Sequence, residues 1–476
     1  MESGIFNQEW SKVSTELVQR PDDIKLWEQL VKAAESNNKN GITKSAAVEE
    51  IELLRVSYTR FLQKYPLLYN YWVKFADWEF KLGDTKKAND VYVKSLQHLS
   101  YSVELWISYL TFKITTMNYN LDEILSLFEE ARSKIGYHFY AYEFYKLYLS
   151  FLENYQTETN EFKSKYYLLL RIIIEVPLYH YEYFFKKWFN LFVQIGSDDA
   201  AAAKLLPLIV PEKELKSFKG TENKQIAVLL KKTYVDAYIT TQFKVYELFN
   251  FEKHISKQYF DTSIISQQQL SAWERYLDFL ELRDYPRAYI ISTYERCLIA
   301  TAKYSKFWLR YSNYFIASKR YIRASEVLTR GVSYSAHFEL LIKLIDLNLY
   351  LQNFTKARDL VLAYIQTNVS IPLPVYEKLI SIERLLHPGD DDYVFGLFRE
   401  LIKETSNDWF FHHILNYSLP KELKENLFHE FETSFKNSEV YNNALKKLKN
   451  RTNSQVEDKQ KFDFEKDYDE EIALCL

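Results

Sequence analysis

Hydrophobic and polar positions along this chain follow the period of an α-helix, and aromatic residues mark that period. Large apolar side chains recur at i, i+3 and i+6, close to one face of a helix. The triplet that begins at Trp72 returns at Trp106, which is 34 residues further along the chain, and it returns again at Trp273 and Trp308. A fixed period of this size predicts a stacked array of helical repeats.

The aromatic triplets are expected to be the core of the repeats. An alternative is that they stack on RNA bases, as aromatic side chains do in proteins that bind single strands. The periodicity favours burial between the two helices of each repeat. The predicted repeat-core residues are Trp27, Trp72, Phe75, Trp78, Trp106, Tyr109, Phe112, Tyr145, Tyr148, Trp273, Tyr276, Phe279, Trp308 and Tyr311.

Each repeat is predicted to consist of two helices, A and B. Helix A carries the aromatic triplet, often followed by an acid such as Glu79, and helix B opens with a small residue such as Ala88. A short polar turn, Leu82–Gly83–Asp84–Thr85, separates them, with Gly at one helix end and Asp or Thr capping the next. The predicted fold is therefore all-α: an α-solenoid of tandem helix-turn-helix repeats, similar to tetratricopeptide repeats.

The repeats fall into two arrays. Residues 1–196 form the expected N-terminal array, and 231–450 the C-terminal one, which opens with a long amphipathic helix over 231–254. Between them, 197–230 loses the periodicity and contains Pro207, Pro211 and Gly220, so this segment is expected to be an irregular linker. The charged, aperiodic tail, 451–476, is expected to be disordered.

Composition narrows the class of protein. Only 9 Gly and 10 Pro in 476 residues disfavour a β-rich fold, and the net charge of −3 gives no global basic field for nucleic acid. Two cysteines cannot build a disulfide framework, which indicates a reducing compartment. We expect no signal peptide and no membrane span, and hence a soluble protein inside the cell.

Candidate chemistry is sparse. The adjacent His412 and His413 point about 100° apart on a helix, and no Cys or acid stands at ligand spacing, so no metal is expected. Cys297 is expected to be a buried, inert thiol. Because no phosphate loop or nucleophile motif is present, we expect no catalytic residue, no cofactor and no enzyme activity.

The repeat motifs resemble a known family. The A-helix pattern Trp-x-x-Tyr/Phe-x-x-Phe/Trp with Ala-x-x-x-Tyr-Glu-Arg on helix B is similar to the half-a-tetratricopeptide (HAT) repeat of RNA-processing proteins. Four central runs resemble the pre-mRNA-processing factor 39 and 42 family of the U1 small nuclear ribonucleoprotein: 249–255, 270–279, 294–300 and 307–311. The short stretch before the first repeat favours factor 42.

This resemblance implies a structural scaffold in pre-mRNA splicing. The protein would support 5′ splice-site recognition in the nucleus through protein–protein contacts with a paralogous HAT-repeat subunit, the U1 C protein and the U1 seventy-kilodalton protein. RNA contact would be indirect or minor, and no membrane would be involved. Two alternatives stay open: a HAT-repeat scaffold in mRNA 3′-end cleavage or ribosomal-RNA processing, and a direct RNA-binding protein.

The resemblance also implies a homo- or heterodimer through the C-terminal repeats. These repeats carry more aromatic area than one helix pair is expected to bury, and such area marks interaction sites. The alternative is that these residues close the array's own core. The expected interface residues are Trp409, Phe410, Phe411, Leu427, Phe428, Phe431 and Phe435.

Overall fold

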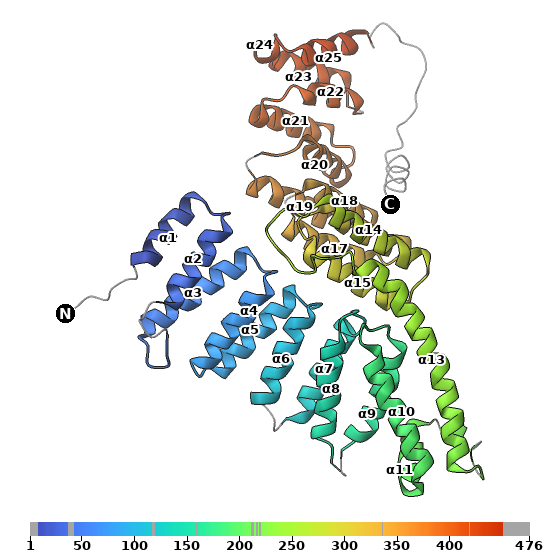
Figure 1. The fold of residues 1–476 in the computed structure, drawn as a ribbon. Helices are drawn as coiled ribbons and strands as arrows, with labels where there is room; N and C mark the ends of the chain where they lie inside the picture. The colour runs from blue at the N-terminus through green and yellow to red at the C-terminus, as the bar shows by residue number, and fades with distance from the viewer. Residues whose placement is uncertain are drawn as a thin grey trace, which may run out of the picture. The chain divides into compact units, whose positions relative to one another are not determined.

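The fold consists of helices joined by turns and loops (Figure 1). The computed structural model describes residues 8–36, 42–116, 120–157, 160–210, 214–215, 218, 220–335, 337–368, 370–417 and 419–450. These residues contain 24 helices and no strand. The all-α prediction is therefore confirmed. None of the helices in this part of the chain is long and apolar enough to cross a membrane.

The chain divides into two compact units, Met1–Thr301 and Ala302–Leu476. In the first unit, successive helices from α1 to α10 stack side by side, and the longest, α13, packs along α10 (Figure 1). The helices of this unit are α1 (Gln8–Gln19), α2 (Ile24–Glu35), α3 (Val48–Lys64), α4 (Tyr69–Lys81), α5 (Thr85–His98), α6 (Val103–Thr116), α7 (Leu121–Ile135), α8 (Tyr142–Asn154), α9 (Phe162–Glu175), α10 (Tyr181–Ser197), α11 (Asp199–Ile209), α13 (Asn223–Glu252), α14 (Gln267–Leu282) and α15 (Arg287–Ala300).

In the second unit successive helices from α16 to α24 pack on one another along the chain, and α25 packs on α22. Its helices are α16 (Ser305–Ala317), α17 (Tyr321–Tyr334), α18 (Phe338–Tyr350), α19 (Phe354–Thr367), α20 (Leu373–Leu386), α21 (Asp391–Thr405), α22 (Trp409–Asn416), α23 (Lys421–Glu430), α24 (Glu432–Phe435) and α25 (Glu439–Asn450).

Turns between the helices of a pair share one backbone feature, a residue with positive φ. In the described chain it is found between α4 and α5, α14 and α15, α16 and α17, α18 and α19, and α20 and α21. The residues are Gly83, Asp284, Lys319, Gln352 and Gly389, with φ between 51° and 89°. A left-handed residue ends helix A sharply and lets helix B fold back on it.

Tryptophans at the start of helix A fasten the preceding turn. The indole N–H donates to the carbonyl oxygen six residues earlier: Trp27 to Pro21 at 2.9 Å, Trp72 to Pro66 at 2.9 Å, Trp106 to Ser100 at 2.8 Å and Trp308 to Ala302 at 2.9 Å. Trp273 differs, because its Nε1 is buried and has no hydrogen-bond partner in the described structure. The recurrence gives tryptophan a reason to stand at this position in addition to its size.

The expected core residues lie mostly inside the two units. Ten of them are buried: Trp72, Phe75, Trp106, Tyr109, Tyr145, Tyr148, Trp273, Tyr276, Trp308 and Tyr311. Trp27, Trp78, Phe112 and Phe279 are half-buried. Their role as the core of repeats stays a prediction, to which this burial adds weight.

The acid that follows the aromatic triplet forms an ion pair with the preceding helix. Glu79 on α4 is buried and receives two bonds of 2.8 Å from the Arg55 guanidinium on α3. Glu383 on α20 accepts from the Arg358 guanidinium Nε on α19, and its other carboxylate oxygen accepts from the Tyr393 hydroxyl. The bidentate pair at Glu79 fixes both distance and orientation, so it sets how α4 packs on α3.

Part of the segment 197–230 is helical, where the sequence pattern predicts an irregular linker. It contains α11 and the first turns of α13, and the Asp198 side chain caps α11 by accepting from the Ala200 N–H at 2.9 Å. Pro207 lies two residues before the end of α11. The hydrogen bond that its missing N–H cannot donate is therefore lost only in the last turn of the helix. The long helix predicted over 231–254 begins earlier, at Asn223, and ends at Glu252.

The compact units also divide the chain elsewhere than the repeat pattern does. The first unit includes α13, α14 and α15, which the sequence assigned to the C-terminal array. The boundaries 1–196, 197–230 and 231–450 stay predictions. The tail, 451–476, lies outside the described residues.

The expected interface residues of the last repeats pack largely within the chain. Phe410, Phe411, Leu427, Phe428 and Phe431 are buried in one cluster with Tyr441, and Trp409 and Phe435 pack against its edge. Because α25 contributes Tyr441, Ala444 and Leu448 to this core and exposes Lys446 and Lys447, it covers the end of the array with a polar face. This placement fits the alternative that these side chains close the array's own core.

Candidate functional site

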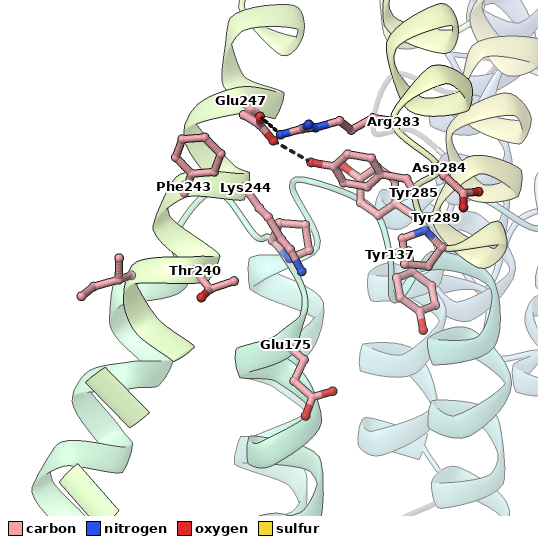
Figure 2. Close-up of a pocket in the computed structure, with 13 residues that line it drawn as sticks. Tyr137, Glu175, Thr240, Phe243, Lys244, Glu247, Arg283, Asp284, Tyr285 and Tyr289 are labelled. Atoms are coloured by element: carbon pink, nitrogen blue, oxygen red, sulfur yellow. Dashed lines mark hydrogen bonds and ion pairs between the residues drawn. The ribbon is translucent and has the colours of Figure 1, made fainter. Parts of the chain in front are cut away.

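A pocket of about 590 Å³ opens beside α13 in the first unit (Figure 2). It is bounded by α13, the end of α9, the α14–α15 turn and the turn after α7. The lining is mostly aromatic or apolar, with charged groups among it: Tyr137, Glu175, Pro177, Ile239, Thr240, Phe243, Lys244, Glu247, Arg283, Asp284, Tyr285, Pro286 and Tyr289.

The α13 wall is held in place by the opposite face of that helix. Tyr234 stacks on Trp188 of α10 with ring centroids 4.9 Å apart, and Thr241 donates through its buried hydroxyl to the Ile174 carbonyl at 2.8 Å. Because this face is fixed on α9 and α10, Ile239 and Phe243 on the other side remain exposed.

The facing wall is the tight turn between α14 and α15. Asp284 adopts φ 51° there, which turns the chain so that Arg283 and Tyr285 face α13. Arg283 forms an ion pair with Glu247 of α13 at 3.1 Å, and the Tyr285 hydroxyl donates to the same carboxylate at 3.4 Å (Figure 2). Burial and the Glu247 charge raise the pKa of Tyr285 to about 12, so Tyr285 stays a hydrogen-bond donor at neutral pH.

Tyr289 forms the floor of the pocket and connects it to a buried polar network. Its hydroxyl lies 3.1 Å from that of Tyr276. Behind them, the Arg296 guanidinium pairs with Glu252 and lies 5.3 Å from the ring centre of Trp273. Burial lowers the pKa of Arg296, but the charge and hydrogen bonds of Glu252 outweigh it and hold that pKa above its usual value.

The same network reaches the turn between α7 and α8. The Arg296 guanidinium also lies 5.9 Å from the ring of Tyr140. Burial, and then the Arg296 charge, lower the pKa of the neighbouring His138 well below its ordinary value. The pocket floor therefore rests on a buried ion pair between Arg296 and Glu252.

The arrangement suits the binding of an apolar side chain rather than a reaction. Phe243, Tyr285 and Tyr289 offer aromatic surface, and the exposed Lys244 ammonium forms no ion pair with a described residue, so a carboxylate next to the bound side chain could meet it. No cluster of three or more His, Cys, Asp or Glu that could hold a metal occurs in the described ranges.

The expected site residues lie elsewhere. Trp273 and Tyr276 stand behind the pocket floor, and no predicted core or interface residue lines it. His412 and His413 do not converge, since His413 stacks on Trp409 at 4.6 Å and His412 is exposed. The feature of the sequence that could have indicated the pocket is the pattern of α13, whose apolar residues occupy two opposite faces.

Comparison with sequence families gives two matches in tandem. The model described as the PRP39 N-terminal HAT repeat matches residues 11–190, and the one described as the PRP39 C-terminal HAT repeat matches residues 246–385. Together they cover more than half of the chain, in the order that their names imply.

Several individual proteins are similar over most of this chain. Pre-mRNA-processing factor 39 of Schizosaccharomyces pombe is 30% identical over 345 residues, which are 68% of this chain and 54% of that protein. The U1 small nuclear ribonucleoprotein component PRP42 of Saccharomyces cerevisiae is 27% identical over 361 residues, 72% of this chain and 63% of that protein. Human pre-mRNA-processing factor 39 is 25% identical over 65% of this chain and 48% of its own length.

The matched part of the chain thus spans 48% to 63% of the length of these relatives. Among solved structures, that of CstF-77 aligns with a TM-score of 0.42 at 13% identity, covering 81% of this chain and 89% of that one. A similarity of that size supports no inference for this chain. The choice between factors 39 and 42 stays a prediction, since relatives of both names match.

Proposed function

We propose that this chain, which belongs to the PRP39/PRP42 family of HAT-repeat proteins, is a structural subunit of the U1 small nuclear ribonucleoprotein. In that role it would support recognition of the 5′ splice site during pre-mRNA splicing. The observation that carries the proposal is the tandem match to both PRP39 HAT-repeat models, together with a relative named as a U1 component.

The mode of action is scaffolding rather than catalysis. A solenoid exposes long helix faces to other proteins, and the site described above offers a binding pocket without a nucleophile paired with a base. The net charge of −3 supports RNA contact that is indirect or minor. The partners we propose are a paralogous HAT-repeat subunit, the U1 C protein and the U1 seventy-kilodalton protein, all in the nucleus.

We also propose that the chain pairs with a second HAT-repeat molecule through its C-terminal repeats. Since five of the seven expected residues are buried in the chain's own core, the contact would use the outer surface of α22–α25. Sedimentation equilibrium of the full chain, alone and mixed with its paralogue, measures this directly. A species with the mass of a pair is expected, and a monomer in both experiments would contradict pairing.

The U1 assignment is tested by purifying the tagged full chain from nuclear extract and sequencing the bound RNA. We expect U1 RNA to be enriched over other small nuclear RNAs, together with U1 proteins. Enrichment of cleavage and polyadenylation factors, or of ribosomal-RNA precursors, would instead support the alternative scaffold functions. A tagged unrelated helical-repeat protein serves as the control for non-specific capture.

A second measurement separates a scaffold from a direct RNA binder. In filter binding with purified protein and U1 RNA, a scaffold is expected to bind weakly and to the same extent as it binds an unrelated RNA. Tight, selective binding by the isolated chain would favour the RNA-binding alternative.

A further inference from the structure

Helix α13 carries an exposed apolar stripe along its outer face. Its members are large hydrophobic side chains at spacings of 7, 4, 4 and 3 residues, which fall on one side of a helix with 3.6 residues per turn. They are Val228 (66% exposed), Val235 (36%), Ile239 (55%), Phe243 (57%) and Tyr246 (67%). Over these positions the stripe runs for about 27 Å at 1.5 Å per residue.

The stripe lies opposite the face of α13 that is already packed. Ile226, Leu230, Val245 and Leu248 are buried against the first unit, where α13 packs on α9 and α10. Surface helices of globular proteins usually carry one apolar face and one polar face. A helix with two opposite apolar faces, of which one is covered, is typical of an element that binds a further partner.

The stripe and the pocket form one continuous surface, because Ile239 and Phe243 belong to both. Figure 2 shows Phe243 and Lys244 projecting from the same turns of α13 at the pocket. A groove that combines a long apolar stripe with a deeper pocket suits a helix whose side chains repeat at i, i+4 and i+7, with one of them inserted as an anchor.

Charge along the helix indicates the chemistry of the partner. From residue 223 to 246, α13 carries Lys224, Lys231, Lys232 and Lys244 but a single acid, Asp236, so this stretch is +3 in a chain of net charge −3. All four ammonium groups belong to exposed residues, and none forms an ion pair within the part of the chain that the structure describes. A partner with acidic residues beside its apolar face would be complementary.

We propose that the α13 stripe and the adjoining pocket are a docking groove for an amphipathic helix of a partner protein, whose apolar face is flanked by acidic residues. One large apolar side chain of that helix enters the pocket beside Phe243, with an acid next to it facing Lys244. RNA fits the groove less well, because three of the five stripe residues are aliphatic and offer no flat surface on which bases stack.

This inference goes beyond the U1 assignment and does not depend on it. The groove is a property of one helix face, so a chain that failed to purify with U1 RNA could still bind such a helix. Equally, loss of the groove could leave other contacts of a U1 scaffold in place. The test therefore uses purified full-length chain and synthetic peptides.

The probes are three labelled peptides of about five helical turns, compared by fluorescence anisotropy. The first has Leu at i, i+4 and i+7 positions with Glu on the flanks, the second has Lys in place of every Glu, and the third has Ser in place of every Leu. We expect the acidic peptide to bind at least about ten-fold more tightly than either of the others, since both charge and apolar area contribute.

Variants locate the binding on α13. Ile239→Glu and Phe243→Glu should each weaken the acidic peptide about ten-fold or more, as expected for anchors at the centre of an interface. The matched control is Ile322→Glu on α17 of the second unit, at a position 75% exposed that belongs neither to the stripe nor to the pocket lining, and it should leave the affinity unchanged. All three positions are exposed, so folding is expected to survive, and circular dichroism verifies it.

Charge reversal provides the second arm. The double variant Lys231→Glu/Lys232→Glu should weaken the acidic peptide and strengthen the lysine peptide. The proposal is overturned if the acidic peptide does not bind, if both charged peptides bind equally, or if Phe243→Glu binds like the unaltered chain. It is also overturned if single-stranded RNA binds the groove and displaces the peptide, which would identify a nucleic-acid surface.

Discussion

Arg296 on α15 and Glu252 at the end of α13 form a buried, two-pronged ion pair, with Arg296 Nη1 2.6 Å from Glu252 Oε1. The side chains are 5% and 0% exposed. Trp273 and Tyr140 place their rings over the same guanidinium, so four segments of the first unit meet at one charge. This relationship fixes α13, and with it the pocket, relative to the rest of that unit.

Breaking this pair is expected to be costly. Arg296→Met leaves the Glu252 carboxylate buried without a partner, which should lower the free energy of unfolding by about 3–5 kcal/mol. The double variant Arg296→Met/Glu252→Leu should lose less than the sum of the two single changes, because no charge is left unpaired. Chemical denaturation followed by circular dichroism measures the three values.

The matched control is Arg20→Met, since the Arg20 side chain is 63% exposed and pairs with Glu16 at 3.8 Å. An exposed pair of this kind contributes at most about 1 kcal/mol. If Arg296→Met were as mild as Arg20→Met, the buried network would not be what holds α13.

Two glycines should respond oppositely to alanine. Gly83, with φ +89°, lies in the turn between α4 and α5, so Gly83→Ala should cost about 1–2 kcal/mol of backbone strain. Gly396 lies inside α21 with open space around an added Cβ, so Gly396→Ala should stabilise by about 0.5–1 kcal/mol through helix propensity. Thermal unfolding of both variants checks the signs, and a gain from Gly83→Ala would refute the account of the turn.

Trp106 is expected to be a core residue whose loss spreads to its neighbours. It is 1% exposed, and its indole fastens the turn before α6. Trp106→Ala should cost about 3–5 kcal/mol. Since repeats support one another mainly through adjacent interfaces, new sites of limited proteolysis should appear in α4–α8 first. Val18→Ala, at a position 82% exposed, is the control, and an unchanged digest of Trp106→Ala would contradict the repeat assignment.

The second unit should lose stability on mild acidification through His413. Burial, followed by the His412 charge, lowers the pKa of His413 from 6.5 to about 4. The neutral imidazole is therefore the native form, and the unfolded chain takes up the proton first as pH falls. Stability should decline between about pH 6.5 and 4, by at most about 1.4 kcal/mol per pH unit.

His413→Phe keeps the stacking against Trp409 and removes the titrating group. The melting temperature of this variant should fall less between pH 7 and 5 than that of the unaltered chain. Some decline should remain, because burial also lowers the pKa of His138 in the first unit. Identical pH profiles for the two proteins would show that His413 does not carry the effect.

The aromatic period alone was enough to predict the all-α repeat fold. Residues such as Trp72 and Trp106 recur because the same position of each repeat is buried in the same way. Their spacing along the chain therefore predicts which side chains are packed in the core. The polar turn at Gly83 and Asp84 was also predictable from the sequence, because a left-handed glycine and a capping Asp side chain depend only on neighbouring residues. The acid after the triplet was visible, but its partner Arg55 lies 24 residues away and was not predicted.

Contacts between residues distant in sequence were decided by the tertiary structure. Tyr259 packs on Tyr69 and donates to Glu104, 155 residues earlier, which no local period could indicate. The C-terminal aromatics illustrate the same limit: sequence showed a surplus of apolar area at Phe410 and Phe428, and packing with Tyr441 of α25 determined that it is buried.

The pattern of residues predicts what repeats locally: the helices, the turns and the helix face that holds the aromatic residues, and these features indicate the family. Which apolar faces are covered depends on the folded chain. In α13, Val245 and Phe243 are both large and apolar, but one is packed against the first unit and the other is exposed at the pocket. The physical reason is that hydrophobic periodicity fixes which residues share a face, whereas burial depends on what the folded chain places against it.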